Sequence, residues 1–230
     1  MITDNSKHTS TIYYSRNVPH LSMDTYDYNT ANKFRPWYSK NKFKTLVIDI
    51  SQDEKDLLSS YQYRVRRYVR KASEMRLEYN IHRSGEDFYD LQKSIVQFNP
   101  NVTYYPYSLL TPRPHRLFTT IKTSKFGILS MHGHLLDPEN SQCLLSMNIS
   151  RYREFQDSKV RQLAGMANTF LFHRDFMHFN KMGFTKYDMG GFEIDTLKQF
   201  KKGFGGNVVH YYRYKPLLSS FIRKIKNKIQ

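Results

Sequence analysis

The sequence has little cysteine and no long apolar segment. Cys143 is the one cysteine among 230 residues, which excludes an internal disulfide, and nothing near it indicates a metal site. No stretch is long or apolar enough to span a bilayer, and the N-terminus lacks the charged start and apolar run of a signal peptide. These absences predict a soluble protein of a reducing cytoplasm that holds no metal.

Acidic residues are also few. Asp and Glu total 20 against 36 Lys and Arg, which gives a net charge of +16. This excess predicts an anionic partner, and nucleic acid, a membrane surface or a phosphorylated substrate would each satisfy it. The chain also contains 18 Tyr and 16 Phe, so a basic and aromatic nucleic-acid-binding surface stays among the alternatives.

Composition divides the chain into three regions. Residues 1–40 are polar and tyrosine-rich and are expected to form an extended arm, whereas 41–215 are expected to form one domain large enough for a core and a cleft. Residues 216–230 are a basic amphipathic tail. Its apolar stripe is typical of an interfacial helix, so contact with the inner face of a membrane is one expectation and packing on the protein itself or on a partner subunit is the other. The stripe consists of Leu218, Phe221, Ile222, Ile225 and Ile229.

Apolar periodicity predicts alternating strands and helices between these ends. The expected strands are 44–50, 77–82, 128–136, 144–149, 184–188 and 208–214. The expected helices are 51–72, opened by a capping box of Ser51 and Glu54, then 84–98, one beginning at 117–121, 164–182 closed by Gly183, and 196–204. This order predicts an α/β fold with a mixed, mostly antiparallel sheet flanked by helices.

A run of small residues follows the expected hairpin. Small residues at a helix N-terminus let an anion reach free backbone N–H groups and the positive end of the helix dipole, so this run is interpreted as a pyrophosphate-binding turn. The alternative is a helix start that is small because it packs on the sheet. The residues concerned are Gln162, Leu163, Ala164, Gly165, Met166, Ala167 and Asn168.

Four segments carry a family resemblance: YRVRRYVRKA (63–72), GMAN (165–168), KMGFTKYDMGG (181–191) and FKKGFGG (200–206). Together they resemble the C-terminal GNAT half of the Fem family, the peptidoglycan-bridge aminoacyltransferases and their shorter relatives, over about 44–214. The run beginning at Gln162 also has the Gln/Arg-x-x-Gly-x-Gly/Ala spacing with which GNAT enzymes bind the coenzyme A pyrophosphate. The resemblance therefore implies a single GNAT-like fold and acyl transfer.

One departure from the Fem pattern changes the expected substrates. The peptidoglycan enzymes contain two GNAT-like halves, and this chain has room for one. The resemblance then implies an N-acyltransferase that takes its acyl group from acyl-CoA and transfers it to a small anionic acceptor, such as a nucleotide- or lipid-linked amino sugar of surface-polysaccharide synthesis. One alternative keeps the chemistry with aminoacyl-tRNA as the donor. Another is a non-enzymatic nucleic-acid-binding module.

Acyl transfer to an amine needs a proton acceptor. Asp188, at the end of a strand, and Glu193, after the double glycine, are carboxylate candidates. His132 and His134 lie two apart, share one face of a strand and could both line a cleft. The alternatives are a polar strand face for the histidines and a structural, turn-capping carboxylate for Asp188.

Cations are expected to neutralise substrate charge. Lys201, next to Phe200, stands where the Fem-like motif has its Phe-Lys pair, which implies a role at the substrate or the developing oxyanion. Arg67 and Lys71 share a face of the basic helix and are candidates for binding an acceptor phosphate. In each case the alternative is a solvated basic side chain, and Phe200 is also a candidate core residue.

Overall fold

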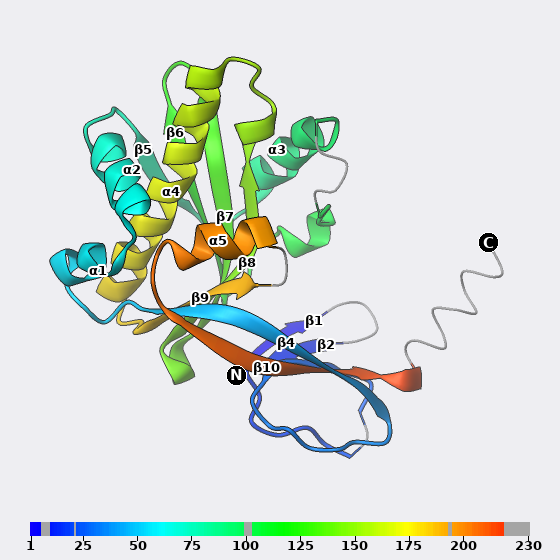
Figure 1. Cartoon of the computed structure of the whole chain (residues 1–230). Helices are drawn as coiled ribbons and strands as arrows, with labels where there is room; N and C mark the ends of the chain where they lie inside the picture. The colour runs from blue at the N-terminus through cyan, green and yellow to red at the C-terminus, as the bar shows by residue number, and fades with distance from the viewer. Residues whose placement is uncertain (6–9, 21, 99–102, 193–194, 219–230) are drawn as a thin grey trace.

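The computed structural model describes residues 1–5, 10–20, 22–98, 103–192 and 195–218 (Figure 1). Their strands form a single ten-stranded sheet in the order β1-β2-β3-β10-β4-β9-β8-β7-β6-β5. The strands are β1 (Ile2–Asn5), β2 (Ser10–Tyr13), β3 (Thr25–Asn29), β4 (Tyr38–Asp49), β5 (Glu78–His82), β6 (Arg116–Thr123), β7 (Gly127–Asp137), β8 (Gln142–Ser150), β9 (Lys186–Gly191) and β10 (Asn207–Pro216). The helices are α1 (Glu54–Ser60), α2 (Tyr63–Ser73), α3 (Glu86–Val96), α4 (Ser158–Lys181) and α5 (Asp195–Lys202).

The sheet is mixed and mostly antiparallel, which confirms the predicted fold class. Only β2–β3 and β8–β9 pair in parallel among the described strands. The predicted hairpin is present as β7 and β8, which pair antiparallel and are joined by a short turn at Pro138–Asn140. The parallel pair β8–β9 is connected by the long helix α4, as a parallel crossover requires.

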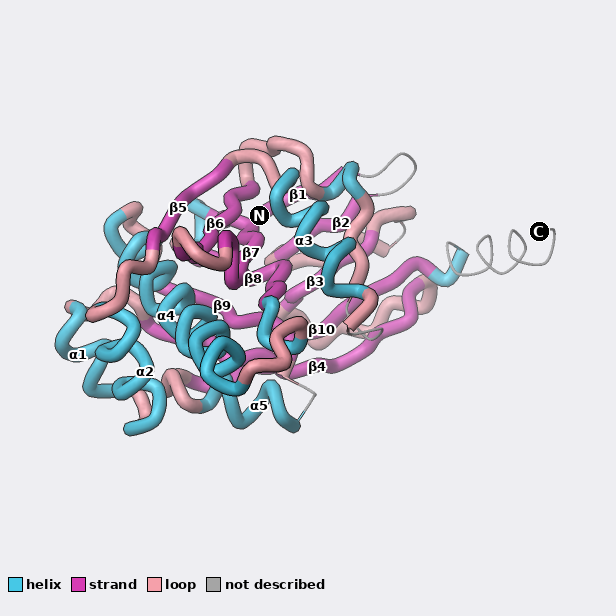
Figure 2. Tube along the Cα trace, turned by 90° about the horizontal axis from the view of Figure 1, so that it is seen from above, coloured by secondary structure: helices cyan, strands magenta, loops and turns pink. Residues whose placement is uncertain are grey.

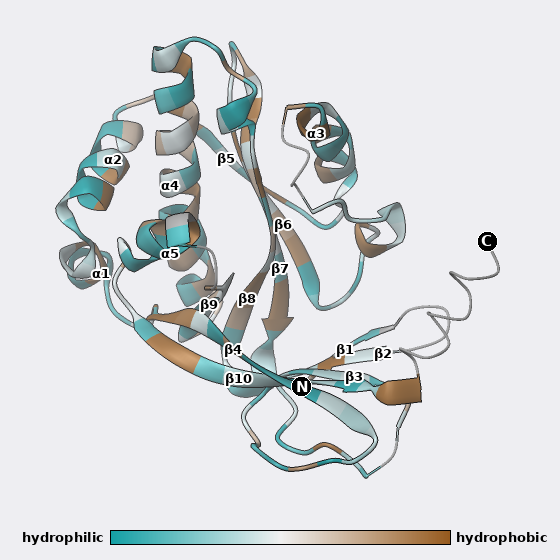
Figure 3. Ribbon diagram, turned by 45° about the vertical axis from the view of Figure 1, so that its right-hand side comes forward, coloured by the Kyte–Doolittle hydropathy of each residue, from teal (hydrophilic) through white to brown (hydrophobic). Residues whose placement is uncertain are grey.

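Helices cover both faces of the sheet. The main core lies between the sheet and α1, α2, α4 and α5, and Figure 2 shows these four helices on one side. Helix α3 covers the opposite face, where Phe88 and Ile95 pack on Phe118 and Met131. Figure 3 shows that β7 and β8, which lie beneath α4, are largely hydrophobic. Most residues of both strands are buried, as expected for strands that are covered on both faces.

The N-terminal region is extended, and it joins the sheet. Strands β1, β2 and β3 come from it, and it contributes the start of β4. Asp4 is paired with Arg116, whose guanidinium is 2% exposed, at 2.7 Å, and also with Arg113. Further along, the described chain ends just after β10, so the tail residues 219–230, with four of the five stripe residues, lie outside the described part. No helix in the described ranges is long and apolar enough to cross a membrane.

The prediction of one continuous helix over 51–72 is wrong. Two helices, α1 and α2, replace it, because the backbone at Tyr61 is extended and the Gln62 N–H donates to the carbonyl of Gly203 at 2.8 Å. The N-cap is Asp53, which accepts from the Asp56 N–H, while Ser51 bonds to Asp49 instead. A tertiary bond to a distant turn thus overrides local helix periodicity.

The prediction that a helix begins at 117–121 is also wrong. These residues lie in β6, which pairs antiparallel with β5 and β7 and is buried along most of its length. Thr119, Thr120 and Ile121 are β-branched and fit a pleated sheet better than a helix. The apolar run is too short for its periodicity to distinguish the two.

Helix α4 begins earlier than expected. Its N-cap is Asp157, which accepts from the N–H groups of Lys159 and Val160, so the first helical residue is Ser158 rather than one near 164. The predicted end is correct, because Gly183 has φ +89° and donates to the carbonyl of Asn180. Gly165 therefore lies inside the helix, and a Cβ there would be 3.5 Å from the Tyr152 ring, an ordinary contact.

This placement predicts that Gly165→Ala stabilises the protein by about 0.5–1 kcal/mol, since alanine loses less backbone entropy in a helix interior. Gly183→Ala, at the other end of α4, is the matched contrast and should destabilise it by about 1 kcal/mol, because φ +89° strains any residue with a Cβ. Urea unfolding measures both values. A Gly165→Ala protein that is less stable than wild type would contradict this helix register.

Candidate active site

The candidate site is a cleft where β8 and β9 separate. The two strands pair from Gln142 with Lys186 to Leu144 with Asp188, and no further pair follows. Beyond that point the strands diverge around a cleft of about 430 Å³. Residues 145–150 of β8, 189–191 of β9, and side chains from α4 and α5 form its walls.

The main chain of β8 makes one wall of the cleft. Its opposite edge is paired with β7, whereas the edge that faces β9 has no strand partner after Leu144. An unpaired strand edge offers N–H and C=O groups to an extended ligand. The Leu145 carbonyl approaches Gly190 so closely that a Cβ there would be 2.9 Å from the oxygen, and Gly190 has φ +69°. Only glycine fits that point.

Lys201 holds the end of β9. Its ammonium donates to the carbonyl oxygens of Met189 at 2.6 Å, Gly190 at 3.2 Å and Gly191 at 2.6 Å. The side chain lines the cleft and is 7% exposed. Burial lowers the pKa of Lys201 to about 8, and the negative charge of Asp188 opposes that shift. With its three donors occupied by carbonyls, the lysine fixes the wall and places a positive charge beside the cleft.

Asp188 lies behind the β9 wall and is fully buried. It accepts hydrogen bonds from the Gly190 N–H at 2.8 Å, from Thr45 Oγ1 at 3.2 Å and from the Tyr14 hydroxyl at 3.4 Å. Burial raises the pKa of Asp188 to about 7, although these hydrogen bonds and Lys201 oppose the rise. Such a pKa suits a general base, but Asp188 is absent from the residues that line the cleft.

Asn168 connects the cleft to a buried cluster of polar side chains. It projects from α4 into the cleft wall, and its Oδ1 lies 3.3 Å from Nε2 of His132. The other ring nitrogen, Nδ1, is 2.7 Å from Oδ2 of Asp175 on the same helix. Both ring nitrogens are therefore bonded, which fixes the imidazole and, through it, Asn168.

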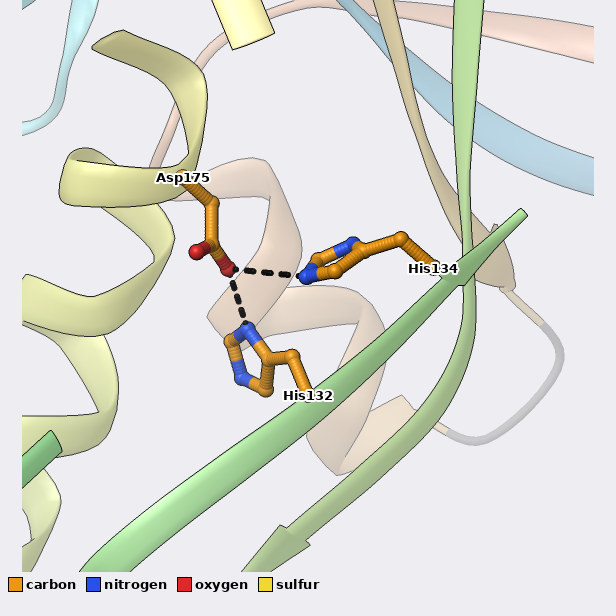
Figure 4. Close-up of side chains that lie close together, drawn as sticks. All are labelled: His132, His134 and Asp175. Carbon is orange, nitrogen blue, oxygen red and sulfur yellow. Dashed lines mark hydrogen bonds and ion pairs between the residues drawn. The ribbon is translucent and has the colours of Figure 1, made fainter. Parts of the chain in front are cut away.

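The two histidines share one face of β7, as predicted, and neither reaches the cleft. Both lie beneath α4 with no exposed surface, and both turn toward Asp175, as Figure 4 shows. His134 also bonds to the hydroxyls of Thr119 and Tyr187. Burial alone would raise the pKa of Asp175, but His134 and His132 lower it well below its ordinary value. The pKa of His134 is lowered by burial.

The same three residues are a possible metal-ligand set. One ligand atom from each of His132, His134 and Asp175 lies within 4.8 Å of the others. Neighbouring ligand atoms of a tetrahedral zinc are about 3.4 Å apart, given metal–ligand distances near 2.1 Å. The 2.7 Å contact from His132 to Asp175 is shorter than that and is a hydrogen bond. Binding of a metal ion by these residues would require the ring of His132 and the carboxylate of Asp175 to move apart.

The predicted pyrophosphate turn does not open a helix. Residues 162–167 lie in the second and third turns of α4, where backbone N–H groups bond within the helix, and Gln162 is exposed. The true helix start is occupied by the carboxylate of Asp157. Small residues serve packing here: Ala164 and Ala167 are buried, as is Met166, while Leu163 is partly buried against the core. Of the seven residues, only Asn168 lines the cleft.

The remaining predicted residues fall in three places. Phe200 lines the cleft and packs against Phe172 with the two rings tilted, so it serves both core and site. Arg67 and Lys71 are exposed on α2, and of the two only Arg67 lines a hollow, on the far side of α4. Glu193 lies outside the described residues.

Asp175 was missed by sequence reasoning. A signal existed, because Asp175 interrupts the apolar stripe of α4 between Leu171, Phe172, Phe176 and Phe179. A carboxylate on a core-facing stripe is almost always paired. Its partners come from distant strands, so they could not be named without the fold.

The class of fold is GNAT-like, and solved structures share it. FemX aligns with a TM-score of 0.56 and 14% identity over 79% of this chain and 63% of that chain. L-PGS from Bacillus licheniformis aligns at 0.55 with 9% identity, covering 84% of this chain and 67% of that one. The C-terminal domain of a lysylphosphatidylglycerol synthetase from Agrobacterium fabrum aligns at 0.54 with 10% identity, covering 92% and 79%.

This chain thus spans 63% of the length of FemX. No protein-family model matches the chain, and no curated protein matches it in sequence. At identities this low, the likeness establishes the fold.

The raised pKa of Asp188 predicts an unusual pH dependence of stability. Between its ordinary pKa of 3.8 and about 7, the folded state binds a proton that the unfolded chain has released. The free energy of unfolding therefore falls as pH rises through this window, by up to about 4 kcal/mol from this group. The amide side chain of the Asp188→Asn variant does not titrate, so its free energy of unfolding should not fall in this window. Between pH 5 and pH 8 the stability of the variant should therefore rise by about 2–3 kcal/mol relative to that of wild type.

Denaturant unfolding at several pH values measures this difference. Asp90→Asn, at an exposed aspartate of α3, is the matched control and should follow wild type. If the free energies of unfolding of Asp188→Asn and wild type changed with pH in parallel, Asp188 would be ionised throughout this range, and the prediction would be wrong.

Proposed function

We propose that this protein is an acyl-transferring enzyme whose donor occupies the cleft between β8 and β9. The observation that carries the proposal is the early end of the β8–β9 ladder, which leaves a strand edge facing a cleft of about 430 Å³ beside Lys201. An extended acyl-bearing arm can add to that edge by main-chain hydrogen bonds. The resemblance of four sequence segments to the Fem family and the likeness in fold to FemX support the same chemistry.

Aminoacyl-tRNA is the donor that we propose first. The expectation of acyl-CoA depended on a pyrophosphate turn at the start of α4, and there the carboxylate of Asp157 occupies the N–H groups that a pyrophosphate would need. A net charge of +16 suits an RNA-borne donor. One of the structures of similar fold is a C-terminal domain named for a lysylphosphatidylglycerol synthetase, and that name denotes a lysyl group joined to a lipid.

Acyl-CoA remains a second candidate because of the same strand edge. Its pantetheine arm is extended and carries amide groups, which match the unpaired main chain of β8. We propose an anionic amine as the acceptor with either donor, such as a nucleotide- or lipid-linked amino sugar of surface-polysaccharide synthesis.

In the reaction, the acceptor amine attacks the donor carbonyl, and an oxyanion develops on the carbonyl oxygen. Its collapse forms the amide and breaks the bond to the donor, which leaves as the ribose hydroxyl of the tRNA, or as the thiol of coenzyme A, with the proton that the amine loses. Asn168 is the polar side chain of α4 in the cleft wall, and His132 holds it in place. We assign Asn168 to orient the reacting groups. Lys201 keeps the end of β9 in position and contributes a positive field that favours the oxyanion.

A transfer assay tests the proposal. Purified protein is given aminoacyl-tRNA or acyl-CoA with a UDP-linked amino sugar, and mass spectrometry detects the acylated acceptor. We expect transfer from aminoacyl-tRNA. In Lys201→Met, the carbonyls of Met189, Gly190 and Gly191 lose their hydrogen-bond donor, and the end of β9 is no longer held in place. We therefore expect kcat to fall at least tenfold, which corresponds to a rise of about 1.4 kcal/mol in the activation free energy.

The matched control is Lys202→Met, which changes an exposed neighbour on the same helix and should retain activity within twofold. Circular dichroism confirms that both variants fold. Transfer from acyl-CoA alone would reverse the choice of donor, and full activity in Lys201→Met would remove that residue from the site.

A further inference from the structure

A second and larger hollow lies on the opposite side of α4 from the cleft. It has a volume of about 610 Å³ and runs between α2 and α4, which lie next to each other in Figure 1. Asn168 faces the cleft, whereas Phe170, Arg174 and Lys181 of the same helix face this hollow. We call it the α2–α4 groove. Its volume suits a ligand of nucleotide size.

The groove is strongly basic. Arg67 and Arg70 of α2 and Arg174 and Lys181 of α4 contribute to its lining, and all four are exposed. One carboxylate, Glu54, lines it, and that carboxylate is bonded to His173 at 3.2 Å. Within the described ranges, none of the four cations forms an ion pair with a carboxylate. Such a set of unpaired cations around one hollow binds anionic oxygens.

Aromatic rings lie directly against these cations. The guanidinium of Arg174 is 5.3 Å from the ring centre of Tyr79 and 6.0 Å from that of Phe170. Arg67 lies 5.9 Å from the ring centre of Tyr63, which is 69% exposed. Guanidinium planes and exposed rings are the surfaces on which proteins stack nucleic-acid bases. The groove therefore offers both phosphate contacts and a stacking surface.

We propose that the α2–α4 groove binds a nucleotide. Arg70, Arg174 and Lys181 contact its phosphates, and its base stacks at the end of the groove formed by Tyr63 and Arg67. The nucleotide is either a free nucleoside phosphate or a unit of single-stranded RNA, which present the same chemistry. This site is separate from the acyl-transfer cleft, and its test is a binding measurement, so a failure of the proposed reaction leaves it standing.

Calorimetry with the full chain tests the site, using ATP, inorganic pyrophosphate and a short single-stranded RNA as probes. We expect ATP or the RNA to bind, with whichever is tighter identifying the source of the nucleotide. The double variant Arg70→Gln/Arg174→Gln should weaken that binding at least tenfold. Tyr63→Ala should weaken nucleotide binding at least threefold and leave pyrophosphate binding unchanged, because pyrophosphate has no base.

The matched control is Lys55→Gln/Arg76→Gln, which removes the same charge from exposed positions that do not line the groove. It should change affinity less than threefold. Equal losses in the two double variants would overturn the proposal in favour of unspecific attraction by net charge. Equal affinity for pyrophosphate and ATP, or binding only to vesicles of anionic phospholipid, would overturn the assignment to a nucleotide.

Discussion

Three main-chain carbonyls at the end of β9 converge on the ammonium of Lys201. Hydrogen bonds to a charged donor contribute about 1.5–3 kcal/mol each, so this contact fixes the direction in which β9 ends. Because these carbonyls are directed to α5, β9 pairs with β8 no further than Asp188. The cleft and the free edge of β8 both depend on that early separation.

Helix α4 separates the two hollows of the molecule, and a line of buried hydrogen bonds runs beneath it. Asn168 in the cleft bonds to His132, which bonds to Asp175 at 2.7 Å. Asp175 in turn accepts from the hydroxyl of Tyr79 at 3.1 Å, and Tyr79 lines the α2–α4 groove. A buried carboxylate without such partners would cost several kcal/mol. The position of α4 on the sheet therefore depends on polar contacts as well as on its apolar packing.

The order of most elements could be predicted from the sequence, because their periodicity is strong and local. The β7–β8 hairpin, β9 and the end of α4 at Gly183 follow from apolar patterns and turn residues. The break between α1 and α2 could not be predicted, since it depends on a bond from Gln62 to Gly203. Strand β6 could not be distinguished from a helix, because its three apolar residues, Leu117, Phe118 and Ile121, are spaced as they would be on a helix and are too few to define a period.

The site was predictable in part for similar reasons. Spacing predicts that His132 and His134 share one face of a strand, the strand end marks Asp188, and the resemblance to the Fem family marks Lys201. None of these signals shows which of the four residues meets the cleft. The small residues around Gly165 matched a phosphate-binding pattern, and their position in the helix interior shows that packing explains them as well. Patterns of residue type fix local geometry, whereas access to a cleft depends on how α4 lies across the sheet.

Hydrogen exchange read out by mass spectrometry tests the central claim most directly, namely that the acyl donor lies along the free edge of β8. The protein is compared with and without a non-hydrolysable aminoacyl-tRNA analogue. The account predicts slower exchange in residues 145–150 of β8 and 189–191 of β9, and unchanged exchange in β1, at the far edge of the sheet. Donor binding that leaves the exchange of 145–150 unchanged would contradict it.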